Sequence, residues 1–222
     1  MEVQNYLAFT ASELSAPLSL LRQLTLALDY AETPRDESLL KSEIVAVSDQ
    51  LMKTIENLSE IERLESGVFV SEPVCVRSLC DDVKTELEHS DHSRHFLVKY
   101  SKSPLAASNY HLLKNAVYNF SLSALHFSTE ETPSRIEVKT KNNQIRIEIR
   151  DFGPAVPKSF ADSLKNLSAP TSIPMRPLSS GLNLYLATKF ANFLGARPGL
   201  IRHQDGASFT LDLAPSKQAS LL

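Results

Sequence analysis

The sequence is poor in several residue types: among its 222 residues it has no tryptophan, six glycines and two cysteines. Cys75 and Cys80 lie five residues apart on a predicted helix and therefore do not share a face. This spacing favours two core thiols over a disulfide, which is typical of a reducing compartment. The scarcity of glycine becomes important at the loop motifs described below.

Long apolar runs and a strong charge of one sign are also missing. No run of about 18 apolar residues occurs, so no membrane span is predicted. The first residues lack the basic and apolar regions of a signal peptide, and a cytoplasmic location is expected. The formal net charge of -3 gives no indication of nucleic acid or an anionic membrane as a partner.

The first 66 residues have the period of two long helices. Leu7, Leu14, Leu21 and Leu28 recur every seventh residue and predict a helix from residue 2 to about 31. A second seam of Ile44, Leu51 and Leu58 predicts a helix from about 37 to 66, after a break at Thr33–Asp36. Pro17 inside the first helix predicts a kink. One hairpin cannot bury two apolar stripes, so residues 1–66 are predicted to dimerise as a four-helix bundle.

Residues 67–222 combine segments of helical periodicity with segments in which apolar and polar residues alternate, and therefore predict a second, α+β domain. Gly67 is the expected end of the hairpin, and Gly195 is expected to close the last helix. Asn142-Asn143 joins two alternating runs as a predicted hairpin turn. The expected strands are 68–70, 96–100, 135–141, 144–151, 199–203 and 207–213, and the expected helices are 75–89, 110–127, 158–167 and 181–194. The tail 215–222 is expected to be frayed.

The segment Phe9–Leu18 resembles the phosphoacceptor box of sensor histidine kinases, F-x-A-x-x-S-H-E-L-R-T-P-L. The matching residues are Glu13, Leu14, Pro17 and Leu18. Ser12 stands where the family has the phosphorylated histidine, and Ser15 stands where it usually has arginine. No histidine precedes His89, which excludes a phosphohistidine in the hairpin. A serine hydroxyl is a weak nucleophile that needs a base, for which Glu13 is the neighbouring candidate.

The order of elements after the hairpin resembles the ATP-binding domain of histidine kinases, the GHKL-type fold shared with gyrase, heat-shock 90 chaperones and MutL-type proteins. The family's N box, N-L-L-x-N-A-x-K-Y-S, corresponds to residues 119–128. Asn119 matches its first asparagine. Ser123 replaces the asparagine that holds magnesium in the family, and His126 replaces the lysine that contacts phosphate.

Two glycine-rich boxes of the family are reduced in this sequence. The box D-x-G-x-G corresponds to Asp151–Ala155, which keeps Asp151 and Gly153 but has Ala155 in place of the second glycine. The box G-x-G-L-G-L corresponds to residues 179–184, where only Gly181 remains. Glycines in such loops let backbone N–H groups approach phosphate. The resemblance therefore implies at most weak binding of magnesium ATP, and no other cofactor or metal is predicted.

The residues lost are those that phosphoryl transfer needs, because that reaction depends on positioning and on metal and cation stabilisation. The resemblance thus predicts a degenerate histidine-kinase-like signalling protein, a homodimer that binds a response regulator or a histidine kinase. No catalytic residue is assigned. The candidate partner surface is Ser12, Glu13, Ser15 and Ala16, and the candidate nucleotide contacts are Asn119, Ser123, Asp151, Gly153 and Gly181.

Alternatives remain open at each of these positions. A divergent ATP-binding kinase that phosphorylates Ser12 or a partner is the main competing function. Ser12 is otherwise an ordinary exposed helix residue. Asp151 and Gly181 are otherwise a strand-end turn and a helix start. The triplet His89, His92 and His95 has metal-ligand spacing, but its polar, serine-rich setting favours a solvated loop.

Overall fold

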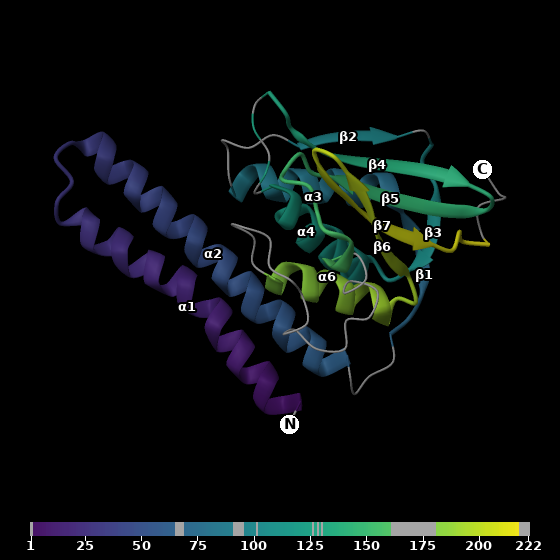
Figure 1. Ribbon diagram of the computed structural model, residues 1–222, viewed down its shortest axis with the longest axis horizontal. Coiled ribbons are helices and arrows are strands. Elements are labelled where there is room, and N and C mark those ends of the chain that lie inside the picture. The colour runs from purple at the N-terminus through teal and green to yellow at the C-terminus, as the bar shows by residue number, and fades with distance from the viewer. Residues whose placement is uncertain are drawn as a thin grey trace. The chain divides into compact units, whose positions relative to one another are not determined.

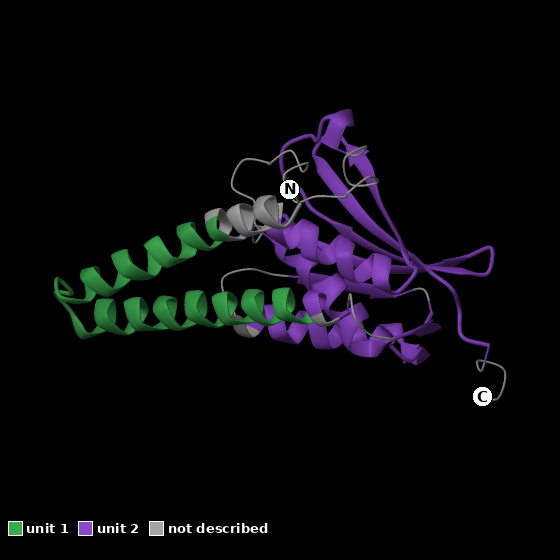
Figure 2. Ribbon diagram, turned by 90° about the horizontal axis from the view of Figure 1, so that it is seen from below, with its two compact units in different colours: residues 1–60 green, residues 61–222 purple. Residues whose placement is uncertain are grey.

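Two compact units, residues 1–60 and 61–222, make up the computed structural model (Figure 1, Figure 2). The structure describes the backbone of residues 2–64, 69–90, 96–100, 102–125, 127, 129, 131–160 and 181–217, and within these ranges it leaves out the side chains of residues 2–10, 12, 13, 63, 89, 90 and 181. The predicted domain boundary between residues 66 and 67 and the predicted helix end at Gly67 lie outside these residues.

The first unit contains the long helix α1 (Glu2–Leu28) and most of the long helix α2 (Pro34–Leu64), whose residues from Ile61 onward belong to the second unit. The predicted break between them is present, and α2 begins three residues earlier than predicted because Thr33 caps it. Thr33 Oγ1 accepts a hydrogen bond from the N–H of Asp36 at 3.1 Å and donates to Asp36 Oδ2 at 2.6 Å. Pro34 fits the first helical position, where no N–H partner is needed. No described helix is both long and apolar enough to cross a membrane.

The second unit contains a small sheet that the sequence did not predict. β1 (Glu72–Cys75) pairs antiparallel with β3 (Leu105–Ser108). The strand predicted at 68–70 is wrong, since Phe69 and Val70 lie outside any strand and residue 68 is not described. Cys75 ends β1 and so is not helical as predicted, whereas Cys80 is buried in the following helix and both thiols are free.

The C-terminal segment adds to this small sheet. The N–H of Ser216 donates to the carbonyl of Leu105 at 2.7 Å, and the N–H of Ala107 donates to the carbonyl of Ala214 at 3.0 Å. The prediction that the tail frays from residue 215 is therefore wrong at Pro215 and Ser216. Backbone hydrogen bonds hold this segment, and they leave no pattern in the side chains. Residues 218–222 lie outside the description.

The main sheet has five strands in the order β2-β4-β5-β7-β6, of which only β2 and β4 are parallel. The predicted turn at Asn142-Asn143 is confirmed. These residues have φ values of 50° and 58°, as a type I′ hairpin requires. The strands are β2 (Phe96–Tyr100), β4 (Ser134–Lys141), β5 (Gln144–Arg150), β6 (Arg197–His203) and β7 (Gly206–Leu213), close to their predicted bounds.

Three of the helices that the structure describes cover one face of the main sheet (Figure 1): α3 (Val76–Ser90), α4 (Tyr110–Leu125) and α6 (Gly181–Phe193). Phe120 of α4 stacks on Phe209 of β7 with ring centroids 5.4 Å apart, and both are fully buried. The α+β fold predicted for this part is thus confirmed. Of the short helix predicted at 158–167, residues 158–160 are helical and the rest lies outside the description.

The end of α6 shows the predicted glycine cap. Gly195 has a φ of 64°. Its N–H donates to the carbonyl of Asn192 at 3.0 Å, and the N–H of Ala196 donates to the carbonyl of Ala191 at 3.0 Å. These two bonds are those of a Schellman motif, which places β6 directly after the helix.

Candidate functional site

Asn119 and Ser123, two of the predicted nucleotide contacts, lie one turn apart on α4 and are only 1% and 2% exposed. Ser123 Oγ donates to the carbonyl of Asn119 at 3.1 Å, and Asn119 Nδ2 donates to the carbonyl of Asn115 at 2.8 Å. Both side chains therefore fold back along their own helix. The serine hydroxyl keeps lone pairs for a cation, but it is a shorter ligand than an amide. His126, the third residue of this motif, is not described.

Asp151 follows β5 and is fully buried. Its Oδ1 accepts hydrogen bonds from the N–H of Gly153 at 3.0 Å and from the N–H of Ala207 at 3.2 Å. The N–H of Asp151 in turn donates to the carbonyl of Ala207 at 2.9 Å. The carboxylate thus fastens the turn after β5 to the start of β7. This is the strand-end turn that the sequence left as the alternative to adenine recognition.

Gly206 makes this arrangement possible on the β7 side. Its φ is 118°, and a Cβ at this position would stand 2.5 Å from Asp151 Oδ1. A side chain here would therefore both strain the backbone and displace the carboxylate. The sequence contains no motif that marked Gly206, because the partner that requires it lies 55 residues earlier in the chain.

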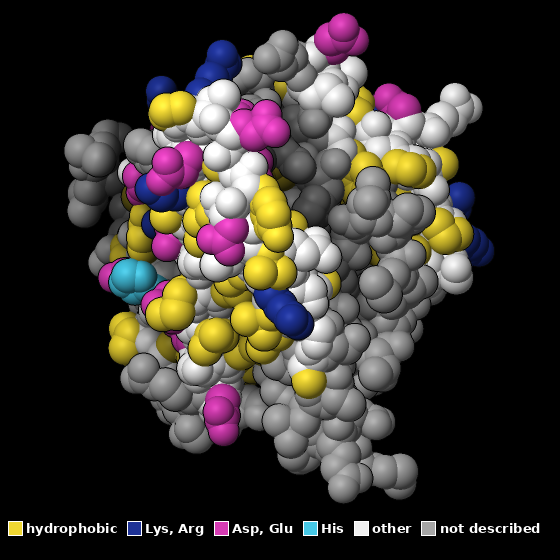
Figure 3. All heavy atoms as spheres, turned by 90° about the vertical axis from the view of Figure 1, so that its left-hand side faces the viewer, with side chains coloured by type: hydrophobic (Ala, Val, Ile, Leu, Met, Phe, Trp, Pro, Cys, Tyr) yellow, Lys and Arg dark blue, Asp and Glu magenta, His cyan; other side chains and the backbone are white. Residues whose placement is uncertain are grey.

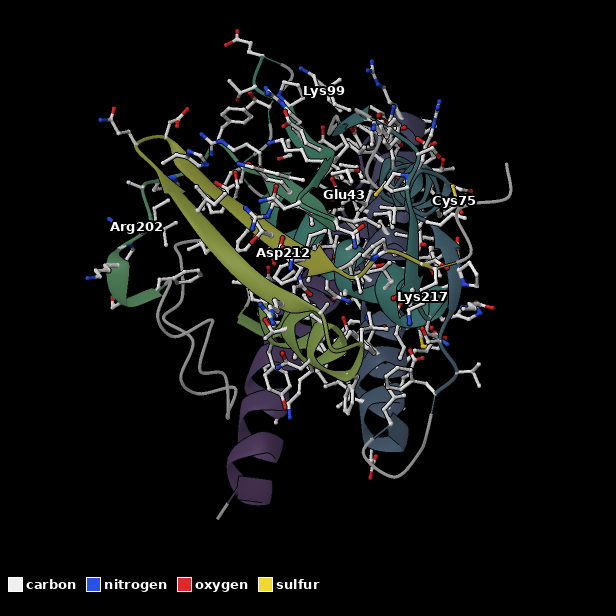
Figure 4. All side chains as sticks on the ribbon, turned by 90° about the vertical axis from the view of Figure 1, so that its right-hand side faces the viewer. Glu43, Cys75, Lys99, Arg202, Asp212 and Lys217 are labelled. Carbon is white, nitrogen blue, oxygen red and sulfur yellow. The ribbon has the colours of Figure 1, made fainter. Side chains whose placement is uncertain are left out.

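Two arginines that the sequence did not single out hold the loops around Asp151. Arg150 donates from Nη2 to Asp205 Oδ1 at 2.5 Å in the β6–β7 turn, and its guanidinium lies 4.5 Å from the ring centroid of Phe152. Arg202 Nε donates to the carbonyl of Val156 at 2.7 Å (Arg202 is labelled in Figure 4). The alternation of β5 and β6 predicts where these side chains point, but not the distant loop atoms that they bind.

The remaining loop positions are only partly described. Gly153 is part of the Asp151 turn, Ala155 is exposed, and Gly181 is the first residue of α6. Asn183 replaces a family glycine and is 5% exposed within the first turn of α6. Residues 161–180 lie outside the description. Among the predicted nucleotide contacts, hydrogen bonds join Asp151 to Gly153 and Asn119 to Ser123.

The predicted partner surface lies on α1. Ser15 and Ala16 are exposed, and Ser15 Oγ donates to the carbonyl of Ala11 at 2.7 Å. Pro17 lies within the helix and has no N–H to offer to the carbonyl of Glu13. Ser12 and Glu13 belong to α1, but their side chains are outside the description. No group of three potential metal ligands occurs among the described residues, and of the predicted His triplet His92 and His95 are not described.

No family model and no curated protein matches the sequence. Solved structures do match. The Acinetobacter baumannii histidine kinase AdeS aligns over 91% of this chain and 96% of its own, with a TM-score of 0.64 and 15% identity. Full-length ShkA in complex with AMPPNP aligns over 98% of this chain, which spans 48% of ShkA, with a TM-score of 0.61 and 16% identity.

A third match is the histidine kinase ThkA in complex with the response regulator protein TrrA. It aligns over 94% of this chain and 60% of its own, with a TM-score of 0.61 and 14% identity. These likenesses extend over both the hairpin and the α+β unit. The chain therefore has the fold of a histidine kinase core, a helical hairpin followed by a GHKL-type ATPase domain.

Proposed function

We propose that this protein is a degenerate histidine-kinase-like signalling protein, a pseudokinase that acts in two-component signal transduction by binding a partner and not by transferring phosphate. One observation carries the proposal: the kinase fold is kept, whereas the residue at the acceptor position is Ser12, which has no nucleophilic imidazole. The hydroxyl that would have to replace the imidazole needs activation by a base.

The nucleotide side of the fold supports the same proposal. Ser123 offers a hydroxyl bonded to its own helix in place of a magnesium-binding amide. Ala155 and Asn183 carry side chains where the resembling motifs have glycine. Phosphoryl transfer requires a positioned triphosphate and metal, so these changes together act against catalysis.

The partner that fits this proposal is a response regulator receiver domain or a histidine kinase. The ThkA structure is a complex of a histidine kinase with a response regulator protein. In this chain Ser15 and Ala16 are exposed on α1 and form, with Ser12 and Glu13, the surface proposed to bind the partner. The small residues Ser12, Ser15 and Ala16 leave room for the close approach of another helix.

The hairpin also supports a homodimer. Large apolar side chains are exposed on it, among them Leu18 at 55%, Val45 at 57% and Met52 at 58%. Figure 3 shows hydrophobic side chains gathered on the face that includes the end of the hairpin. Exposed apolar surface of this extent is unfavourable in water and marks an interaction site. A four-helix bundle made from two hairpins would cover it.

A divergent ATP-binding kinase is the second candidate, and the intact Asp151–Gly153 turn favours it. Asp151 keeps the position of an adenine-binding carboxylate, and its turn is held by hydrogen bonds on both sides. Under this alternative Ser12 or a partner residue would receive the phosphoryl group.

Binding of receiver domains tests the proposed function. We expect the wild-type protein to bind one receiver domain from a panel encoded by the same genome, as measured by isothermal calorimetry. Ala16→Arg should abolish binding and leave the oligomeric state unchanged, because a long cation would occupy the contact. The control Gln23→Arg adds the same charge to an exposed position further along α1. Equal binding by wild type and Ala16→Arg would remove this surface from the proposal.

A further inference from the structure

The main sheet has an open face that the helices of the second unit do not cover. Ile136, Val138, Ile145, Ile147 and Ile149 point into the core, so the residues between them point the other way. The open face is defined here by these alternate strand residues. Its charged members are the basic residues Lys99, Arg135, Lys139, Lys141, Arg146, Arg150 and Arg197 and the acidic residues Glu137, Glu148 and Asp212.

Basic side chains thus outnumber acidic ones by four on this face, although the whole chain has a net charge of -3. Apart from Arg150, whose side chain is 13% exposed, the basic side chains that form ion pairs on this face are more accessible than the acidic ones. Glu148 is 14% and Asp212 is 19% exposed, whereas Lys139 is 49% exposed. Solvent and any docking molecule therefore meet mainly the cations.

The acidic residues are held by ion pairs within the face. Arg146 donates from Nε and Nη2 to the two carboxylate oxygens of Asp212 at 2.6 and 2.7 Å. Lys139 Nζ lies 2.7 Å from Glu148 Oε2 and 2.8 Å from Glu137 Oε2. The centre of the face is therefore electrically balanced and fixed in place.

The excess positive charge lies around this centre. Lys99 on the edge strand β2, Lys141 at the end of β4 and Arg197 on the edge strand β6 are exposed and make no ion pair with any residue the structure describes. Two exposed apolar side chains share the face, Leu97 at 43% and Ile201 at 38%. Figure 4 labels Lys99 and Asp212.

We propose that the open sheet face docks an acidic protein surface whose carboxylates pair with Lys99, Lys141 and Arg197. Charge complementarity is the first argument. The second is that Leu97 and Ile201 supply apolar contacts of the kind found in protein interfaces. This site is separate from the partner surface on α1 and does not depend on the proposed function.

The composition of the face favours protein over a polyphosphate. Leu97 and Ile201, which are 43% and 38% exposed, can pack against apolar side chains of a protein, whereas the phosphates of a nucleic acid or of an anionic membrane offer them no apolar contact.

Binding of a defined acidic peptide tests this inference. The probe is a fluorescein-labelled helical peptide made of Glu, Leu and Ala, measured by fluorescence anisotropy at low salt. The same peptide with Gln in place of Glu, an oligo-dT strand and phosphatidylserine vesicles are measured alongside. Wild-type protein should bind the Glu peptide more tightly than any of the other three, and added salt should weaken that binding.

Two variants with the same change in charge locate the site. Lys99→Gln, Lys141→Gln and Arg197→Gln combined should weaken peptide binding about tenfold, from the loss of three exposed ion pairs. The control combines Lys41→Gln, Lys158→Gln and Lys217→Gln, which are exposed and outside the open face, and should bind like wild type. Circular dichroism verifies that both variants are folded.

Several results would overturn the inference. Absence of binding by the wild type would do so, as would equal weakening in both variants. Tighter binding of oligo-dT or of vesicles would assign the face to a polyphosphate. Aggregation of the first variant with undiminished peptide binding would show that Lys99 and Arg197 serve only to keep the edge strands from pairing with other chains.

Discussion

Tyr110, the first residue of α4, is fastened to α3 through its hydroxyl group. Tyr110 OH donates to Asp82 Oδ2 at 2.5 Å. Burial, together with this hydrogen bond and the negative charge of Asp82, raises the pKa of Tyr110 to about 12. The neutral phenol is therefore the form that the folded state prefers.

This shift predicts a loss of stability at alkaline pH. In the unfolded chain tyrosine has a pKa of about 10, so the folded state binds its phenolic proton more tightly than the unfolded state does. The contribution of Tyr110 is present in full below about pH 10 and is lost as pH rises toward about 12. Urea unfolding of wild type and Tyr110→Phe should show a stability difference at pH 9 that shrinks at pH 11. A difference that stays constant with pH would contradict the assignment.

A sequence motif predicted the position of Asp151 but not all of its hydrogen-bond partners. Its position was predicted from the resemblance of Asp151–Ala155 to a family box. Its hydrogen bond to the N–H of Ala207 and the need for glycine at position 206 were not predicted. The reason is physical: the N–H of Ala207, on a strand more than 50 residues away, donates to the carboxylate, and backbone N–H groups are the same in every residue type except proline.

At the C-terminal end of α6, a substitution of Gly195 would test the glycine cap alone. Gly195 has a φ of 64°, and a Cβ there would meet no atom within 4 Å. Gly195→Ala should therefore cost only the backbone strain of the left-handed conformation, about 1 kcal/mol. Gly195→Asn should cost less, because asparagine tolerates this conformation better. Thermal unfolding measures both, and a loss in Gly195→Asn equal to that in Gly195→Ala would contradict the cap.

The elements that the sequence predicted are those with a long and regular pattern. Both hairpin helices and β4–β5, with its Asn142-Asn143 turn, fall in this group. The four-residue strands β1 and β3 were missed because they are too short for an alternation to appear. The pairing of residues 214–216 with β3 was missed for the same reason. The strand predicted at 68–70 was wrong because a short apolar run was interpreted as a strand.

For the whole molecule, dimerisation through the hairpin is the first prediction. Leu21 is half-buried on α1, and Leu21→Asp would place a charge in the apolar interface of the bundle, which is costly without a partner. The variant should be monomeric by light scattering, while Gln23→Asp, on an exposed position, should remain dimeric. A wild-type protein that is monomeric at micromolar concentration would contradict the four-helix bundle.

The central claim is that this kinase fold does not transfer phosphate, and the most direct test is incubation with magnesium and ATP that carries a radioactive γ-phosphate. The account predicts no label on wild type. It also predicts no label on Ser12→His, because Ser123, Ala155 and Asn183 remain where the resembling motifs hold metal and phosphate. An active histidine kinase core provides the positive control. Label on the wild type that disappears in Ser12→Ala would contradict the account and establish a serine-directed kinase.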